Sequence, residues 1–116
     1  PFRIDSGKQC EVFVPASSSF SSVDSLTTSS AFASCVSLKD GRVLVVGGAT
    51  GSIDDPLPIA DCWVFEPSSG SMTSVSSLSV EHAGGAVFLM EDGTIYMGGG
   101  ESGSGISVDS SESWSP

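Results

Sequence analysis

The 116-residue chain contains no asparagine and only four basic residues, and each shortage excludes a class of protein. Without asparagine there is no acceptor for N-linked glycans. Four Lys and Arg against 14 Asp and Glu give a formal net charge of −10, whereas a nucleic-acid-binding protein needs clustered positive charge to neutralise phosphates. No apolar run reaches the roughly 20 residues of a membrane-spanning helix. We therefore expect neither nucleic-acid binding nor membrane insertion.

Cysteine, histidine and tyrosine are also scarce, with three, one and one residues. Cys10, Cys35 and Cys62 lack the C-x-x-C spacing of structural zinc sites, and their odd number leaves at least one thiol unpaired within the chain. Serine is abundant, at 26 of 116 positions. Together with the acidity and the scarcity of lysine, this composition favours an extracellular or cell-surface protein.

The sequence repeats itself at an offset of 52 residues. Residues 10–48 align with residues 62–100 without a gap; 15 of the 39 pairs are identical, and only four of those are Ser–Ser pairs. A third, partial copy closes the chain, where Trp114-Ser115-Pro116 aligns with Phe65-Glu66-Pro67 after a loop three residues shorter. Serine bias alone does not produce these matches, so the repeat is a property of the fold.

Each copy contains four short strand patterns. We expect strands near residues 33–38, 42–47, 61–66, 85–90 and 94–98, with a fourth short strand near 72–75. The Asp-Gly pairs at 40–41 and 92–93 are typical of two-residue hairpin turns. The double glycines at 47–48 and 99–100 end strands where the backbone needs positive φ or a close approach. No stretch has a helical period, so the pattern predicts an all-β chain of antiparallel strands.

The segment D-G-R-V-L-V-V-G-G at 40–48, followed by Phe65-Glu66-Pro67, resembles a Kelch repeat of the type found in the central domain of galactose-oxidase-like proteins. The resemblance implies four-stranded blades arranged radially in a β-propeller. It divides the chain into an N-terminal extension (1–9), a partial blade (10–30), a full blade (31–80) and a partial blade (81–116). The structural motif residues are Asp40, Gly41, Gly47, Gly48, Phe65, Pro67, Asp92, Gly93, Gly99, Gly100 and Trp114.

About two copies of the repeat fit in the chain, whereas propellers use about four to eight blades. We therefore expect both ends to lie against further Kelch-like repeats, from the same longer chain or from identical copies. Large side chains such as Trp63 should pack between blade faces, and Phe13, Phe65 and Trp114 should occupy equivalent positions there.

No catalytic constellation is evident. His82 is the only histidine and no nucleophile-elbow motif is present, so we expect it to be solvent-exposed or to cap a strand. Asp54, Asp55 and Asp61 in the loop after Gly48 are the candidates for a Ca²⁺ site, although they lack EF-hand spacing. No other metal and no cofactor is expected. Cys10 and Cys62 occupy equivalent positions and are interpreted as small packing residues.

The resemblance also bears on catalysis. Galactose-oxidase-like activity would require copper-binding tyrosines and histidines and a Tyr–Cys crosslink. The one tyrosine here, Tyr96, belongs to a strand expected to be buried, so the resemblance places no such site in this chain.

Three functions follow as hypotheses. The first is a non-enzymatic propeller segment that serves as a structural or protein-interaction module in a larger chain, ring or filament. The second is the scaffold portion of a larger secreted oxidase or carbohydrate-active enzyme. The third is a propeller that binds glycan or protein ligands through its loops, at residues 49–60 and 101–108.

Overall fold

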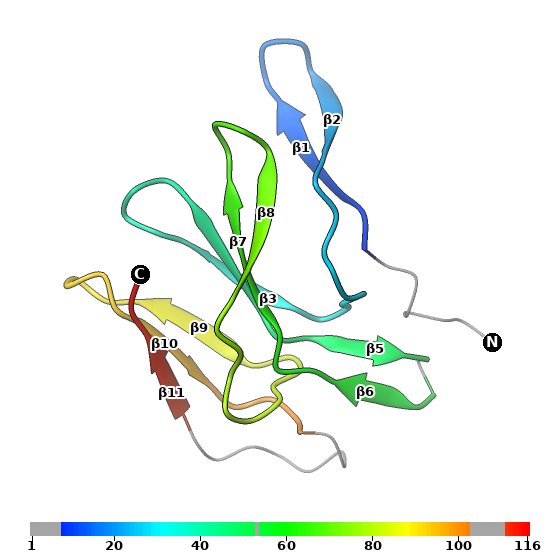
Figure 1. Cartoon of the computed structure of the whole chain (residues 1–116), viewed down its shortest axis with the longest axis vertical. Coiled ribbons are helices and arrows are strands. Elements are labelled where there is room, and N and C mark those ends of the chain that lie inside the picture. Colours follow the sequence, from blue (N-terminus) through cyan, green and yellow to red (C-terminus); the bar gives the residue numbers. More distant parts are fainter. Residues whose placement is uncertain (1–7, 53, 103–110) are drawn as a thin grey trace.

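The computed structural model describes residues 8–52, 54–102 and 111–116, and these residues form only strands, turns and loops (Figure 1). The prediction of an all-β chain with antiparallel strands is confirmed. Because this part of the chain contains no helix, it contains none long and apolar enough to cross a membrane.

The strands pair in four antiparallel groups. The central sheet has the order β3-β4-β7-β8, from β3 (Ser34–Ser37), β4 (Val43–Val46), β7 (Cys62–Glu66) and β8 (Ser71–Val75). The N-terminal sheet pairs β1 (Cys10–Val14) with β2 (Ser19–Val23). The C-terminal sheet has the order β11-β10-β9, from β9 (Ala86–Leu89), β10 (Ile95–Gly98) and β11 (Ser111–Trp114). Every strand expected from the sequence is present within two residues of its predicted bounds.

The Asp-Gly turns have the same hydrogen bonds in both copies. Asp40 accepts the N–H of Arg42 at 3.1 Å, and Asp92 accepts the N–H of Thr94 at 2.9 Å. Each of these backbone N–H groups stabilises the ionised carboxylate and holds its pKa below the ordinary value of 3.8. The 52-residue repeat is therefore visible in atomic contacts as well as in sequence.

The loop after Gly48 contains a short hairpin that the sequence did not predict. It pairs β5 (Ala49–Gly51) with β6 (Pro56–Pro58) and projects from the side of the sheets (Figure 1). Two prolines in a three-residue segment argue against a strand, because proline cannot donate to the ladder and occurs mainly at sheet edges. Here β6 is an edge strand with one neighbour, which tolerates both prolines.

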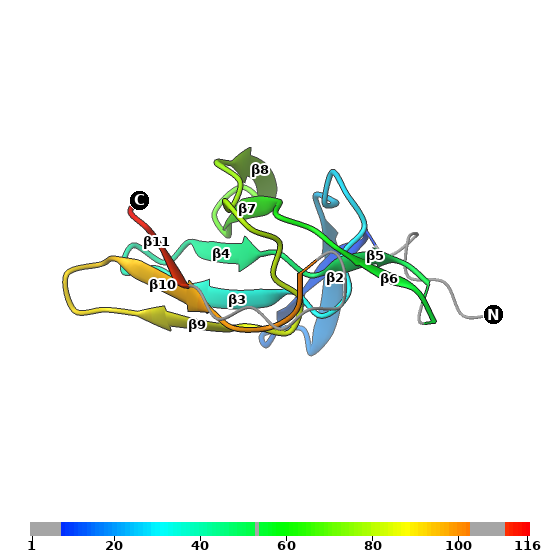
Figure 2. The same ribbon diagram turned by 90° about the horizontal axis from the view of Figure 1, so that it is seen from below.

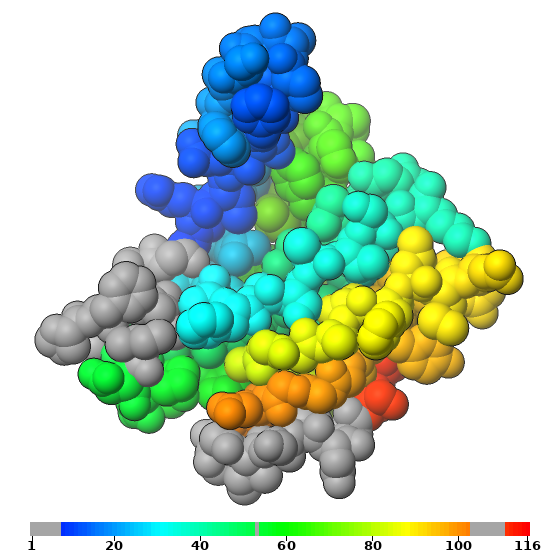
Figure 3. Space-filling model, turned by 180° about the vertical axis from the view of Figure 1, so that it is seen from behind, coloured from blue at the N-terminus to red at the C-terminus, as the bar shows by residue number. Residues whose placement is uncertain are grey.

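The core lies between the central and C-terminal sheets. Leu44, Val46, Cys62 and Val64 of the central sheet pack with Ile95 and Met97 of the C-terminal sheet. The first strands of the two copies, β3 and β9, lie side by side along one edge of this stack (Figures 2 and 3). Stacking of neighbouring copies thus buries apolar surface that one sheet alone would leave in water.

The N-terminal sheet stands apart from this core as a projecting hairpin (Figures 1 and 3). Its two phenylalanines, Phe13 and Phe20, contact each other edge to face with ring centroids 5.3 Å apart, yet remain 52% and 66% exposed. Phe65 and Trp114 are half-buried, so within this chain Phe13 is the most exposed of the three aromatic residues expected to be equivalent. Within the described residues, β1 pairs with β2 alone.

Candidate functional site

The C-terminal sheet has one covered face and one uncovered face. Ile95 and Met97 of β10 point into the core and are 1% and 3% exposed. Between them, Tyr96 points the other way and is 44% exposed, and its cross-strand partner Phe88 is 60% exposed. The strand expected to be buried is thus buried on one side only. We call the other side, formed by Ala86, Phe88 and Tyr96, the outer face.

The internal repeat gives a direct comparison for this outer face. An offset of 52 residues places Tyr96 on Leu44 of the central sheet, and Leu44 is 1% exposed because the C-terminal sheet covers it. The outer face therefore carries apolar side chains at positions that the preceding copy buries beneath a neighbouring sheet.

A second uncovered apolar surface lies on the opposite side of the central sheet. There Val43 and Val45 are half-buried, whereas their repeat equivalents Ile95 and Met97 are buried. A hollow of about 300 Å³ separates these valines from the N-terminal sheet. It is lined by Cys10, Glu11, Val12, Val23, Cys35, Val43, Val45, Phe65 and Met72. Among the described residues, the neighbouring sheet on this side contributes two strands, β1 and β2.

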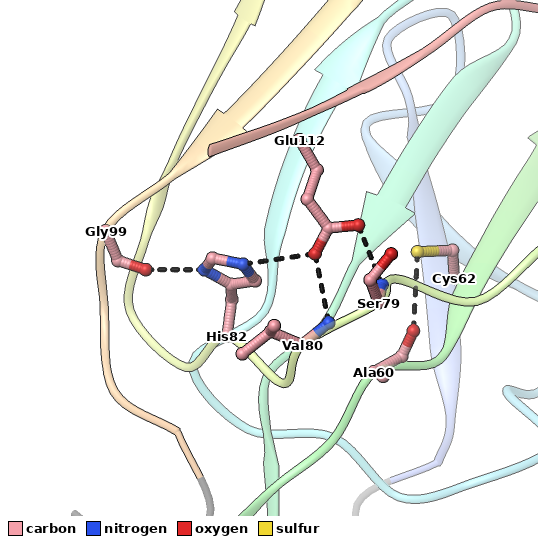
Figure 4. A network of polar contacts seen from close by, with 7 residues as sticks. All are labelled: Ala60, Cys62, Ser79, Val80, His82, Gly99 and Glu112. Carbon is pink, nitrogen blue, oxygen red and sulfur yellow. Dashed lines mark hydrogen bonds and ion pairs between the residues drawn. The ribbon is translucent and has the colours of Figure 1, made fainter. Parts of the chain in front are cut away.

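Between the central and C-terminal sheets, a polar network joins β11 to the segment that precedes β9 (Figure 4). The Glu112 carboxylate accepts the backbone N–H groups of Ser79 at 2.7 Å and Val80 at 3.0 Å. Partial burial acts to raise the pKa of Glu112, but these two N–H groups stabilise the anion, and the net result is a pKa below its ordinary value of 4.5. Glu112 thus anchors residues 79–80 as an ionised acceptor.

His82 lies in the same network and is completely buried, so the first of the two alternatives for this residue, a solvent-exposed histidine, is wrong. Its Nδ1 lies 2.6 Å from the carbonyl oxygen of Gly99, and its Nε2 lies 3.5 Å from Oε2 of Glu112 (Figure 4). Nε2 has no hydrogen-bond partner within the described residues.

The other copy explains why a polar side chain is buried here. His82 aligns with Ser30, whose hydroxyl donates to the carbonyl of Gly47 at 2.8 Å, as the His82 ring does to Gly99. The 52-residue offset aligns His82 with Ser30, so the signal in the sequence is that both positions carry a side chain able to form a hydrogen bond.

The double glycines form the joint between copies. Gly47, Gly48, Gly99 and Gly100 all have positive φ, between +61° and +101°. A Cβ on Gly47 would collide with the carbonyl of His82, and the N–H of Gly48 donates to that same carbonyl at 2.8 Å. The first copy therefore touches the second copy directly through its glycines. Gly99, at the same place in the second copy, has nothing within 4 Å of an added Cβ.

The three carboxylates expected to hold Ca²⁺ do not form a site. Asp54 and Asp55 are exposed in the turn between β5 and β6, whereas Asp61 accepts a hydrogen bond from Thr28 at 2.8 Å. In residues 8–52, 54–102 and 111–116, no three His, Cys, Asp or Glu side chains are grouped so that they could hold a metal ion.

The three cysteines have different surroundings and are free thiols. Cys62 is 5% exposed in the core, and burial raises the pKa of its thiol. Its repeat equivalent Cys10 is half-buried beside the hollow, and Cys35 is exposed on the opposite wall.

The Glu112→Gln variant is expected to lose less stability than the wild-type chain when the pH is lowered into the acid range. The pKa of Glu112 is lowered in the folded chain, so its carboxylate contributes stability above about pH 4.5 and loses that contribution as the pH falls through the lowered value. The variant lacks this titration. Urea unfolding at a series of pH values below 4.5 measures the difference, and parallel stability curves for the two proteins would contradict the role given to Glu112.

No family model and no curated protein matches the chain. Among solved structures, it is similar to a fungal alcohol oxidase of the AA5 family in complex with copper, with 25% sequence identity and a TM-score of 0.72 over 84% of this chain and 22% of the oxidase. It is also similar to YjhT, with 19% identity and a TM-score of 0.62 over 73% of this chain and 25% of YjhT. The chain spans no more than a quarter of the length of either structure.

The oxidase holds copper, but the described residues of this chain do not fit a copper site. Imidazole nitrogens are typical copper ligands, and the one histidine here is buried with Nδ1 engaged by Gly99. Tyr96 lies on the outer face of the C-terminal sheet, whereas His82 lies in the joint between copies. Nothing in these residues therefore supports copper chemistry within the described part of the chain.

Proposed function

We propose that the chain is a segment of a Kelch-like β-propeller whose role is structural: it packs against further repeats on both sides. The N-terminal, central and C-terminal sheets correspond in this proposal to the partial, full and partial blades at 10–30, 31–80 and 81–116. The observation that carries it is the exposure of Tyr96, at 44%, where the repeat-equivalent Leu44 is 1% exposed beneath a neighbouring sheet. A further repeat on the outer face would bury Tyr96 and Phe88 in the same way.

Size and shape support the same proposal. The part of this chain that aligns covers 22% of the oxidase and 25% of YjhT, as expected if two copies of the repeat are part of a larger ring. The further repeats belong to the same longer polypeptide or to identical copies. Copies that join head to tail would form a ring if the rotation closes and a filament if it does not. An extracellular location, favoured by the composition, is part of this proposal.

Sedimentation velocity of the 116-residue chain at physiological salt tests the proposal. We expect concentration-dependent association, which strengthens with added salt because the net charge of −10 opposes contact between like chains. The double variant Phe88→Ser, Tyr96→Ser should associate less, since it removes apolar area from the outer face alone. The double variant Phe13→Ser, Phe20→Ser tests the other end in the same way and should also associate less. A folded wild-type chain that stays strictly monomeric at every concentration and salt would contradict the proposal.

A second candidate is the scaffold portion of a larger oxidase, and the similarity to the AA5 alcohol oxidase favours it. In that case the reacting residues would be supplied outside these 116 residues. The intact mass of the source protein, together with metal analysis for copper, distinguishes the two candidates. A source protein of several repeats without copper supports the structural module, and a larger copper protein supports the oxidase.

A further inference from the structure

Phe32 has a backbone conformation that aromatic residues rarely adopt. Its φ is +61°, in the left-handed region, where the Cβ is crowded by the following carbonyl oxygen. The offset of 52 residues aligns Phe32 with Gly84, whose φ is +73°. Glycine is the residue that this conformation favours, and a Cβ on Gly84 would meet nothing within 4 Å. The first copy therefore carries a phenylalanine at a position where the fold needs only a glycine.

The chain holds Phe32 in this conformation and leaves its ring exposed. Ala31 and Ala49 exchange two backbone hydrogen bonds of 2.8 and 2.7 Å directly before it, and its own carbonyl oxygen accepts the N–H of Gly84 at 3.2 Å. The side chain is nevertheless 57% exposed. Strained residues that persist because their neighbours fix them are concentrated at binding and active sites. Since little of the ring packs within the described residues, the strain points to a contact made outside the chain.

Phe32 borders a hollow of about 210 Å³ that lies between the two copies. The first copy contributes Phe32 and the two prolines of β6, Pro56 and Pro58, and the second contributes Ala83 and Glu101. Among the described residues that line this space, Glu101 is the one charged side chain, and the other walls are apolar. We call this space the Phe32 hollow.

Glu101 is a second departure from the repeat at this hollow. The same offset aligns Glu101 with Ala49, which is completely buried, whereas Glu101 is exposed. Two backbone hydrogen bonds with Ala83, of 3.1 and 3.0 Å, fix the position of Glu101 as those with Ala31 fix Ala49. An aromatic ring and a carboxylate thus stand where the other copy has a glycine and an alanine, and both border one hollow.

From these observations we propose that the Phe32 hollow binds an arginine side chain of a partner protein. A guanidinium is attracted to the face of an aromatic ring and forms paired hydrogen bonds with a carboxylate, and Phe32 and Glu101 supply these two groups. The apolar stem of arginine matches the walls formed by Pro56 and Pro58. The net charge of −10 attracts a basic partner and repels an acidic one. The hollow shares no residue with the outer face to which the proposed function assigns a further repeat.

Titration of the full chain with the peptide Ac-Gly-Gly-Arg-Gly-Gly-NH₂ tests the proposal. We expect saturable changes in the amide ¹H–¹⁵N chemical shifts of Ala83, Gly84 and Glu101, which line the hollow or lie in its backbone bridge. The same peptide with citrulline, which has the shape of arginine without its charge, should bind severalfold more weakly. A lysine peptide should fall between them, because an ammonium neither stacks on a ring nor pairs with both carboxylate oxygens as a guanidinium does.

Variants of the two groups separate their roles. Phe32→Gly and Glu101→Gln should each weaken binding of the arginine peptide severalfold. The matched controls are Phe88→Ser and Glu91→Gln, which remove an exposed ring and an exposed carboxylate that do not line the hollow and should leave binding unchanged. Phe32→Gly has a second readout: because glycine restores the residue of the other copy, its urea midpoint should be no lower than that of wild type.

Absence of binding, or equal affinity for the arginine and citrulline peptides, would overturn the proposal. So would unchanged binding in Phe32→Gly, or a urea midpoint of that variant well below wild type, because the ring would then act by packing in the fold. The walls of the hollow all belong to the two copies described above, so each of these results leaves the proposed packing of further repeats untouched.

Discussion

Trp63→Ala is expected to lower the free energy of unfolding by about 3–5 kcal/mol. The indole is 0% exposed on β7, where the strand pairs with Val45 on one side and Ser74 on the other. Truncation removes a large apolar group from a close-packed site and leaves the Thr27 hydroxyl without the indole N–H that donates to it at 2.8 Å. Because a domain of this size is stable by only about 5–15 kcal/mol, the variant should unfold at a much lower urea concentration.

Trp63→Phe is the control for this substitution. It keeps an aromatic ring in the site but lacks the N–H donor, so its cost should be nearer the value of about 1 kcal/mol for one hydrogen bond than that of the cavity. Urea unfolding followed by circular dichroism measures both variants. If Trp63→Ala cost no more than Trp63→Phe, the side chain would not pack as the structure describes.

Gly47→Ala should also be severely destabilising, by about 3 kcal/mol or more, whereas Gly99→Ala should cost about 1–2 kcal/mol. The two glycines are repeat equivalents with φ of +61° and +77°, so both variants force an alanine into the left-handed region. They differ in surroundings: a Cβ at Gly47 collides with the backbone carbonyl of His82, and a Cβ at Gly99 meets nothing within 4 Å. Both variants carry the backbone strain, so the difference between their losses of unfolding free energy measures the contact between copies at Gly47.

Thermal or urea unfolding of the two variants in parallel measures this difference. Equal losses would mean that the joint at Gly47 relaxes at no cost, contrary to the close packing described. In a longer array of repeats, Gly99 should become as intolerant as Gly47, because the next copy would then approach it. A larger cost of Gly99→Ala in the longer array would indicate that a neighbouring repeat packs against Gly99.

Much of the fold could be predicted because its strongest signals are local. The Asp-Gly turns at 40–41 and 92–93 fix the hairpins, and the double glycines mark where the strands end. The offset of 52 residues then relates one sheet to the next. Such signals depend on backbone conformation, which few residue types satisfy, and so they are legible in a single sequence.

The rest depends on neighbours that are distant in sequence. The burial of His82 comes from Gly99 and from Glu112, which lies on a strand 30 residues later, and nothing adjacent to the histidine indicates either partner. The exposure of Tyr96 likewise reflects which sheet stands next to β10, since the same strand position is buried at Leu44. The three Ca²⁺ candidates are near one another in sequence, but the hairpin of β5 and β6 places Asp54 and Asp55 in its own turn.

The two prolines of β6 have a consequence for aggregation. A free strand edge is a template for uncontrolled pairing with other chains, and the open sheets of the described residues have several such edges. Pro56 and Pro58 lack N–H groups, so at two of its three residues β6 has no donor for an incoming strand. This hairpin is thereby a poor seed for amyloid-like growth. Replacing both prolines with valine would restore the donors and make the exposed edge a hazard.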